Sequence, residues 1–179
     1  MGGENGAGGA ADSTLEILPR IPGGSTLVSL DWLDQTDPNN LYPFLHVLPS
    51  GRIFVGEFER TGFSEFPYSR SRAGYYNEAR ILDPGTFATV QVLPNMPGSV
   101  TSFLAGRTFP NQGTSVLLPQ FAPYTDPITV LICGGSNFGV ALDNCVSIQP
   151  ESNNPTWVIE RMVRSFLPRP IKITRLTDL

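Results

Sequence analysis

The chain has 179 residues, of which 40% are hydrophobic and 16% are charged, and its formal net charge at pH 7 is -4. This length suits one domain of ordinary size. A chain that is acidic overall and lacks a basic stripe cannot neutralise phosphates, so we expect no nucleic-acid partner. No run approaches the roughly 18 apolar residues that span a bilayer, so we expect no membrane partner either.

Glycine and proline separate short apolar runs along most of the chain. The 18 glycines and 17 prolines together make up about a fifth of the 179 residues. The average combined usage of these two residue types is about 12%. Beyond the N-terminal segment they recur between apolar runs, as turns do in an all-β chain. Helical periodicity is scarce. The composition and its pattern therefore predict an all-β fold.

The first segments precede any complete repeat. Residues 1–13 are rich in glycine and alanine, and we expect them to be disordered or to form a loop. They lack the basic start and the apolar segment of a secretory signal. Residues 14–19 alternate apolar and polar side chains and stop at Pro19, which predicts the outer strand of a unit whose first three strands are absent. Residues 25–40 are predicted to form one short helix or a packed loop, from the spacing of Leu27, Leu30, Trp32 and Leu33.

The first complete unit begins after Pro43. Residues 44–48 and 52–56 are predicted strands joined by a Pro-Ser-Gly turn, and residues 79–82 and 89–92 are predicted strands that complete the unit. Residues 57–74 separate the second of these strands from the third and have no counterpart elsewhere in the chain. We predict that residues 57–74 are an insertion foreign to the repeat.

The second unit repeats this order, as an alignment of Leu48-Pro49 with Leu118-Pro119 makes visible. Its strands are predicted at residues 114–119, 130–133, 145–148 and 157–159. Four-stranded repeats with a period near about 50 residues are typical of the blades of a kelch-type β-propeller. The sequence therefore predicts about two complete blades, preceded by one strand of another blade.

Cys133 and Cys145 are the two cysteines of the chain, and a glycine turn and a loop separate them. If strand and loop fold back on one another, they can form a disulfide, which implies an oxidising compartment. Two buried free thiols are the alternative, because unbonded cysteine is among the most buried residue types. The residues alone leave both open.

Residues 163–179 follow the last predicted strand and carry none of the repeat pattern. The codons for Gly56-Glu57-Phe58 and for Met162-Val163-Arg164 can contain the bases that usually begin an intron. We therefore hypothesise that residues 57–74 and 163–179 are translated introns, which the sequence of the transcript would decide.

Three stretches carry a further signal: residues 41–55 (LYPFLHVLPSGRIFV), 79–84 (ARILDP) and 129–136 (TVLICGGS). Together they resemble the N-terminal catalytic region of fungal glyoxal oxidases, which are copper radical oxidases similar in fold to galactose oxidase. The resembling region runs over residues 14–162, apart from the insertion.

The resemblance implies a seven-bladed propeller in a secreted enzyme that oxidises aldehydes or primary alcohols with O2 and releases hydrogen peroxide. Enzymes of this family hold one copper ion with two histidines and two tyrosines, one tyrosine being cross-linked to a cysteine as the radical cofactor. Imidazole and phenolate suit copper(II), and the cross-linked ring stores the second electron that one copper ion cannot. The resemblance thus implies copper, O2 and a small substrate for the full-length family proteins.

By the same resemblance, the family's copper and radical residues fall outside this chain. The cross-linked cysteine and tyrosine precede the point that matches Leu15, and the remaining ligands follow Met162. Cys133 and Cys145 resemble the family's structural pair. His46, the single histidine of the chain, lies in an alternating strand, where we expect it on the polar face of the sheet. We predict no catalytic, cofactor-binding or metal-binding residue in this chain, and no cofactor.

Other chemical patterns are missing from the sequence. It has no Cys-x-x-Cys, His-x-x-x-His, acidic calcium loop or phosphate loop. Gly135-Ser136 has no base at a recognisable spacing, so this serine is not predicted to be a nucleophile. The proline-flanked aromatic residues Tyr42, Phe109 and Tyr124 are expected to pack within the blades rather than to form a platform for a sugar or an aldehyde.

These inferences favour a fragment of a copper radical oxidase that is inactive alone and that self-associates through its open propeller edges. The alternatives are a non-catalytic β-propeller-repeat module, which binds a protein or glycan through its loops, and the non-functional product of a mispredicted gene. The family is extracellular, whereas this chain shows no secretory signal, so the sequence assigns no compartment.

Overall fold

The computed structural model of the chain describes residues 12–19, 22–34, 42–59, 77–98, 106–108, 112–137 and 140–161. Most of the glycine-rich start and of the predicted insertion lies outside these residues, as do Phe109 and the whole predicted tail, 163–179. The predictions for those segments stay predictions. In the described part of the chain the fold is nearly all β, as the composition predicts.

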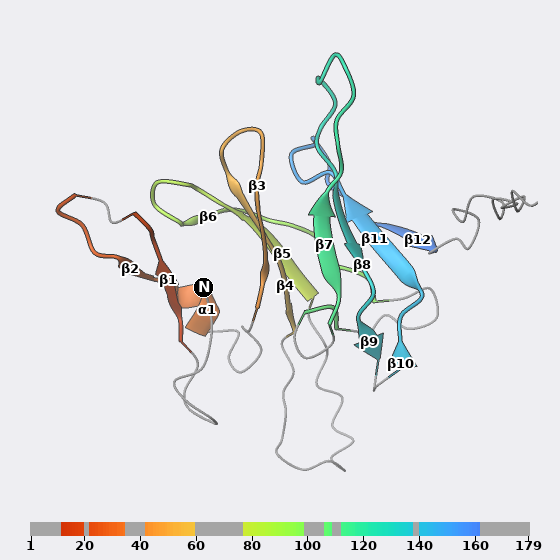
Figure 1. Ribbon diagram of the computed structural model, residues 1–179, viewed down its shortest axis with the longest axis horizontal. Helices are drawn as coiled ribbons and strands as arrows, with labels where there is room; N and C mark the ends of the chain where they lie inside the picture. The colour runs from red at the N-terminus through yellow and green to blue at the C-terminus, as the bar shows by residue number, and fades with distance from the viewer. Residues whose placement is uncertain are drawn as a thin grey trace, which may run out of the picture.

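Figure 1 shows three layers of secondary structure side by side. The first layer is an antiparallel pair of strands, β1 (Thr14–Glu16) and β2 (Leu27–Ser29), followed by the short helix α1 (Asp31–Asp34). The other two layers are four-stranded antiparallel sheets. The order of the layers in space follows their order in the sequence.

Both four-stranded sheets are meanders that continue from one strand to its neighbour along the chain. The first sheet consists of β3 (Phe44–Val47), β4 (Ile53–Glu59), β5 (Asn77–Leu82) and β6 (Thr89–Val92). The second sheet consists of β7 (Thr114–Leu117), β8 (Val130–Cys133), β11 (Asn144–Ile148) and β12 (Val158–Arg161). A small hairpin of β9 (Ser136–Asn137) and β10 (Val140–Ala141) lies between β8 and β11 in the chain. Every strand predicted for the two complete units is confirmed, with small shifts at the ends.

The turn between β3 and β4 shows how a local sequence fixes a hairpin. The amide of Gly51 donates to the carbonyl of Leu48 over 2.8 Å, and the amide of Leu48 donates to the carbonyl of Arg52 over 2.8 Å. Gly51 has a φ of 83°, which glycine adopts at no steric cost. The predicted Pro-Ser-Gly turn therefore forms as expected.

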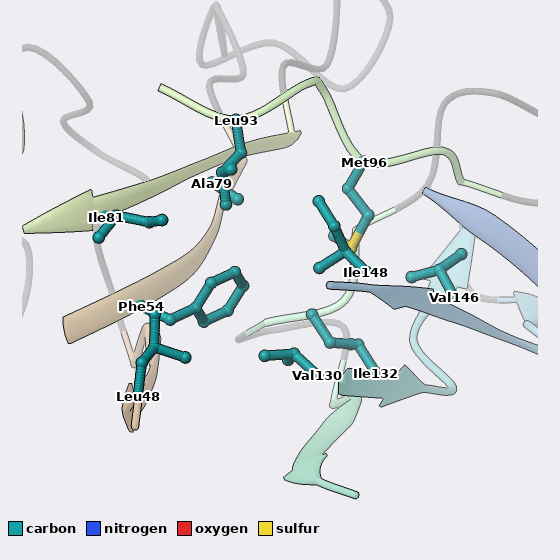
Figure 2. Close-up of a cluster of buried hydrophobic side chains, with 10 residues drawn as sticks. All are labelled: Leu48, Phe54, Ala79, Ile81, Leu93, Met96, Val130, Ile132, Val146 and Ile148. Carbon is teal, nitrogen blue, oxygen red and sulfur yellow. The ribbon is translucent and has the colours of Figure 1, made fainter. Parts of the chain in front are cut away.

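The main core lies between the two four-stranded sheets (Figure 2). Its side chains come from the faces that the sheets turn toward one another and from the segments that end them. They are Leu48, Phe54, Ala79, Ile81, Leu93, Met96, Val130, Ile132, Val146 and Ile148. Phe54 and Ile132 are fully buried, and truncating such a side chain to alanine costs about 2–5 kcal/mol. This interface holds the two sheets together as one folded unit.

The opposite face of the first sheet is covered by the N-terminal layer. Leu30, Trp32 and Leu33 pack in one buried cluster with Val55 and Leu82 of the first sheet. Helix α1 confirms the predicted short helix in this region. The strand β2 was not predicted, because three residues are too few to display an alternation.

Two hydrogen bonds bridge the two sheets on either side of the main core. His46 on β3 and Ser115 on β7 are joined by a 2.8 Å bond between Nε2 and Oγ. Trp157, just before β12, donates from Nε1 to the carbonyl of Pro94, just after β6, over 2.7 Å. The sheets are therefore stacked with first strand beside first strand and last strand beside last strand.

No helix in the described part of the chain is long and apolar enough to cross a membrane.

Candidate functional site

His46 lies on the core side of the first sheet, so the prediction that it faces the polar side is wrong. Its neighbours Leu45 and Val47 are 42% and 67% exposed. The imidazole ring instead lies 6.2 Å from the ring of Phe54, between centroids, and bonds to Ser115. Burial lowers the pKa of His46, because removing water disfavours the charged form. The strand alternates as predicted, but the apolar side chains of Leu45 and Val47 take the more exposed face and His46 takes the core face.

Cys133 and Cys145 form a disulfide, so the alternative of two buried free thiols is wrong. The two residues are direct partners across β8 and β11, with their Cα atoms 4.0 Å apart. The bond closes the loop that contains the β9–β10 hairpin. Neither sulfur is available for the cross-link to a tyrosine that the radical cofactor requires.

The expectation that the proline-flanked aromatic residues pack within the blades is wrong for both that the structure describes. Tyr42 is 71% exposed and Tyr124 is 68% exposed. Both have a positive φ, 54° and 61° respectively, as residues in tight turns do. An aromatic residue beside a proline therefore marks a turn here rather than a core position.

A copper site of the family's class does not fit the residues that the structure describes. His46 is the single histidine of the chain, and it bonds to Ser115 rather than facing a tyrosine. Across the described ranges, no three histidine, cysteine, aspartate or glutamate side chains gather closely enough to hold a metal ion. No step through copper is therefore assigned to these residues. That the chain has no catalytic residue stays a prediction.

Arg107 is a buried residue that the sequence did not single out. It is fully buried, and its guanidinium donates to the carbonyls of Gly134 over 2.7 Å and of Asn144 over 3.3 Å. It also donates to the carbonyls of Pro97 and Gly98. Since the rigid guanidinium has five donors, one side chain fixes three chain segments. The sequence around Arg107 does not predict this bridging role, because the acceptors are backbone atoms of residues distant in the chain.

The glycine pair after β8 has a structural role next to Arg107. Gly134 and Gly135 have φ values of 73° and 103°, and a Cβ atom on Gly135 would meet the carbonyl oxygen of Gly106. The next residue, Ser136, exchanges backbone hydrogen bonds with Gly106 over 3.0 and 3.1 Å. Close backbone approach thus accounts for the Gly-Gly-Ser motif.

A cavity of about 370 Å³ lies at one end of the second sheet. Most side chains in its lining are polar and uncharged, and Glu160 is the one charged group among them. The lining consists of Leu118, Thr129, Ser147, Ile148, Gln149, Ser152, Asn154, Thr156, Val158 and Glu160. Ser147 donates from Oγ to Glu160 Oε1 over 2.9 Å. The sequence did not indicate this cavity, because its residues come from separate segments that only the sheet brings together.

The loop between β7 and β8 begins at this cavity and projects beyond the sheet (Figure 1). At its base, the amide of Leu118 donates to the carbonyl of Thr129 over 2.8 Å. Near its tip, Phe121 is 82% exposed, and its carbonyl accepts a 2.8 Å bond from the amide of Tyr124. Gln149 of the cavity donates to the carbonyl of Pro127 in the loop over 3.3 Å. An ordered loop with two exposed aromatic rings thus borders a polar cavity.

The described part of the chain thus forms two stacked four-stranded antiparallel sheets beside a smaller N-terminal layer. The chain belongs to the glyoxal oxidase N-terminus family, whose model matches residues 6–167. The resemblance inferred from the sequence is thereby confirmed.

Curated relatives agree with this family. A WSC domain-containing protein of Arthroderma benhamiae is 56% identical over 164 residues, which is 90% of this chain and 16% of the relative. An aldehyde oxidase of Vitis pseudoreticulata, named Aldehyde oxidase GLOX, is 27% identical over 87% of this chain and 27% of its own length. The putative aldehyde oxidase Art an 7 of Artemisia annua is 29% identical over 71% of this chain and 20% of its own length. The chain therefore spans less than a third of each of these relatives. No solved structure matches it.

Proposed function

We propose that this chain is a segment of a copper radical oxidase, in which its two four-stranded sheets are neighbouring blades of a seven-bladed, kelch-type β-propeller. The stacking of equivalent strands carries this proposal, with His46 bonded to Ser115 at the first strands and Trp157 to Pro94 at the last. Propellers repeat four-stranded sheets radially around a channel, which brings equivalent strands of neighbouring blades side by side.

The outer face of the second sheet supports a further neighbour in the whole protein. When Leu48 is aligned with Leu118, His46 corresponds to Val116, and Val116 points away from the first sheet because the adjacent Ser115 points toward it. Val116 is 50% exposed, and Val158 on β12 is 54% exposed. In the first sheet the corresponding face is covered by the second sheet. We infer that another sheet of the same kind covers the outer face.

The reaction proposed for the whole protein is the oxidation of small aldehydes or primary alcohols by O2, with release of hydrogen peroxide. Two relatives are named as aldehyde oxidases, and the family implies copper in its full-length members. The described residues of this chain offer no donor set that fits the copper site. We therefore propose that the copper and radical residues lie in the rest of the protein and that this chain alone is inactive.

Copper content and hydrogen peroxide release on the purified chain test this proposal. With glyoxal or methylglyoxal as substrate, we expect neither stoichiometric copper nor turnover, while a full-length member of the family assayed in parallel shows both. Folding is checked on the same sample by a cooperative unfolding transition in urea. Stoichiometric copper with turnover would mean that this chain builds the site itself.

The second candidate function is that of a non-catalytic module, which the exposed aromatic loop beside the cavity favours. A module of this kind is a monodisperse protein that unfolds cooperatively. The remaining alternative, a mispredicted gene product, is tested separately by searching the native proteome for a peptide from residues 57–70. Detection of that peptide would remove the mispredicted-gene alternative.

A further inference from the structure

We infer that the neighbouring sheet which covers the outer face of the second sheet carries a basic side chain, and that this side chain pairs with Glu160. The inference rests on the proposed function, in which that neighbour is another blade of the whole protein. It adds the chemistry of the partner surface, which is apolar against the first strands of the second sheet and positively charged opposite Glu160.

The strand registers give the core-facing residues of the first sheet equivalents on the outer face of the second sheet. Leu48 is aligned with Leu118, and the cross-strand partners then carry the correspondence from strand to strand. The equivalent pairs are His46 and Val116, Phe54 and Leu131, Ile81 and Ser147, Ala79 and Cys145, and Leu93 and Glu160. The outer face therefore uses the same positions as a face that is buried against another sheet.

Two of these positions change from apolar to polar. Ile81 and Leu93 belong to the main core and are 0% and 2% exposed. Their equivalents are joined by a hydrogen bond, which Ser147 Oγ donates to Glu160 Oε1 over 2.9 Å. The equivalent residues on the first two strands of the second sheet stay apolar. The outer face is therefore apolar on β7 and β8 and carries a carboxylate on β12.

A sheet that covers this face removes water from the carboxylate of Glu160. A carboxylate has about four acceptor sites, and Ser147 supplies one donor. A buried charge is costly unless it is paired and hydrogen-bonded. Among the described residues, none that lines the cavity around Ser147 and Glu160 is basic. The positive charge therefore comes from the covering sheet, and arginine fits best because its planar fork can donate to both carboxylate oxygens.

Charge also distinguishes this partner from a second copy of the chain. The same face of a copy presents another Glu160, and the described residues that line its cavity include no basic one. Two such faces in contact would bury two carboxylates without a counterion from either lining. Like charges at an interface act against the wrong partner. Glu160 therefore favours a neighbour with a basic side chain over pairing of the outer face with itself.

The same substitutions in two proteins test this pairing. One protein is the 179-residue chain alone. The other is a chimera in which this chain replaces the matching region of the Arthroderma benhamiae relative, which is 56% identical to it and of which it covers 16%. The chimera supplies the rest of a family member around the outer face. Urea midpoints are measured for both proteins.

Val116→Asp shows whether a sheet covers the outer face. Val116 is 50% exposed, so we expect the chain alone to tolerate the charge. In the chimera the midpoint should fall, because the new carboxylate would be buried against an apolar surface. Equally small effects in both proteins would mean that no sheet covers the face. That outcome, or a chimera without a cooperative unfolding transition, would count against the proposed function and the inference together.

Glu160→Leu shows whether a basic side chain lies opposite, because it introduces the residue type of the equivalent Leu93. The substitution would leave the partner's charge buried and unpaired, so the midpoint of the chimera should fall by roughly 1 M urea. Glu160→Gln keeps an acceptor for Ser147 and should lower it in the same direction. Both variants should change the chain alone much less, since Glu160 is exposed there.

The pairing is overturned if Glu160→Leu raises the midpoint of the chimera or leaves it unchanged while Val116→Asp still lowers it. In that case an apolar sheet covers the face without a basic side chain, and the proposed function stands.

Discussion

His46 and Arg107 each join parts of the chain that are far apart in sequence. His46 reaches Ser115, 69 residues away, and Arg107 reaches the carbonyls of Gly134 and Asn144, 27 and 37 residues away. These partners are neutral oxygen atoms. A neutral partner suits an imidazole that carries no charge, and the lowered pKa of His46 fits this state. Single polar side chains thus fix long-range geometry that the apolar core leaves less specific.

The first prediction concerns the pH dependence of stability at His46. Because burial lowers the pKa of folded His46 from its ordinary value of 6.5, the unfolded chain binds a proton more readily. The contribution of neutral His46 to the stability of the folded chain is complete above about pH 6.5. It is lost as the pH falls from there toward the lower pKa of the folded state. Urea midpoints measured between pH 7.5 and 5 should therefore decline for the unaltered chain.

The control for this prediction is His46→Gln, which keeps a hydrogen-bonding group on the side chain but has no titrating group. Its midpoint should vary less over the same pH range. Hydrogen bonds to Thr14 and to Thr86 also lower the pKa values of Asp12 and Asp83, but both carboxyl groups titrate below that pH range, since their ordinary pKa is 3.8. Equal pH dependence in the two proteins would contradict the prediction.

Single residues were the scale at which the sequence was least informative. The alternation around His46 was visible, yet two apolar neighbours, Leu45 and Val47, suggested that the imidazole faced water. The structure reverses this because the core face of β3 is closed by a second sheet from residues far along the chain. Tyr42 and Tyr124 were misassigned for a related reason, since hydrophobicity does not tell whether a turn residue finds a surface to pack on.

At the scale of elements, the strands of the two four-stranded sheets could be predicted from the sequence. The short strands β2, β9 and β10 could not. The runs at β3 and β8 are apolar and end in turns that glycine makes, so propensity and turn chemistry agree. β2 has three residues, and β9 and β10 have two each, which is too short for any period to show. Their formation depends on backbone partners, such as Gly106 for Ser136. The cavity likewise depends on how the connections of two hairpins meet.

The second prediction concerns the disulfide that joins β8 to β11. Cys133 and Cys145 are separated by 12 positions, and bonds that close loops of this size stabilise proteins by about 2–4 kcal/mol. Reduction with dithiothreitol should lower the urea midpoint of the chain accordingly. A variant with Cys133→Ser and Cys145→Ser should start at the lower midpoint and show no response to the reductant. An unchanged midpoint on reduction would contradict the prediction.

At the scale of the whole molecule, the four edge strands all carry exposed apolar side chains. Val47 on β3 is 67% exposed, Val92 on β6 is 63% exposed, Val116 on β7 is 50% exposed and Val158 on β12 is 54% exposed. An exposed apolar edge is a template for pairing with another chain. In a closed propeller the same strands would line the channel or the rim. We therefore propose that the isolated chain self-associates.

The third prediction follows from these edges. Sedimentation velocity on the isolated chain should show species larger than a monomer, in proportions that rise with concentration. Charging two edges with Val47→Lys and Val92→Lys should shift the distribution toward the monomer, because lysine on an edge strand opposes pairing. Val140→Lys is the matched control, since Val140 is 70% exposed but belongs to the β9–β10 hairpin. The prediction is contradicted if the unaltered chain is monomeric. It is also contradicted if Val140→Lys shifts the distribution toward the monomer as much as the edge substitutions do.

The N-terminal layer makes the two ends of the stack of sheets different from one another. Strands β1 and β2 with helix α1 cap the middle of the first sheet, while no element of the described part of the chain covers the outer face of the second sheet. A contact between the outer faces of two copies is two-fold and closes at a pair. Contacts through the edges have no such closure and continue into larger assemblies. The sizes present in solution therefore distinguish association by faces, which stops at a dimer, from association by edges, which does not.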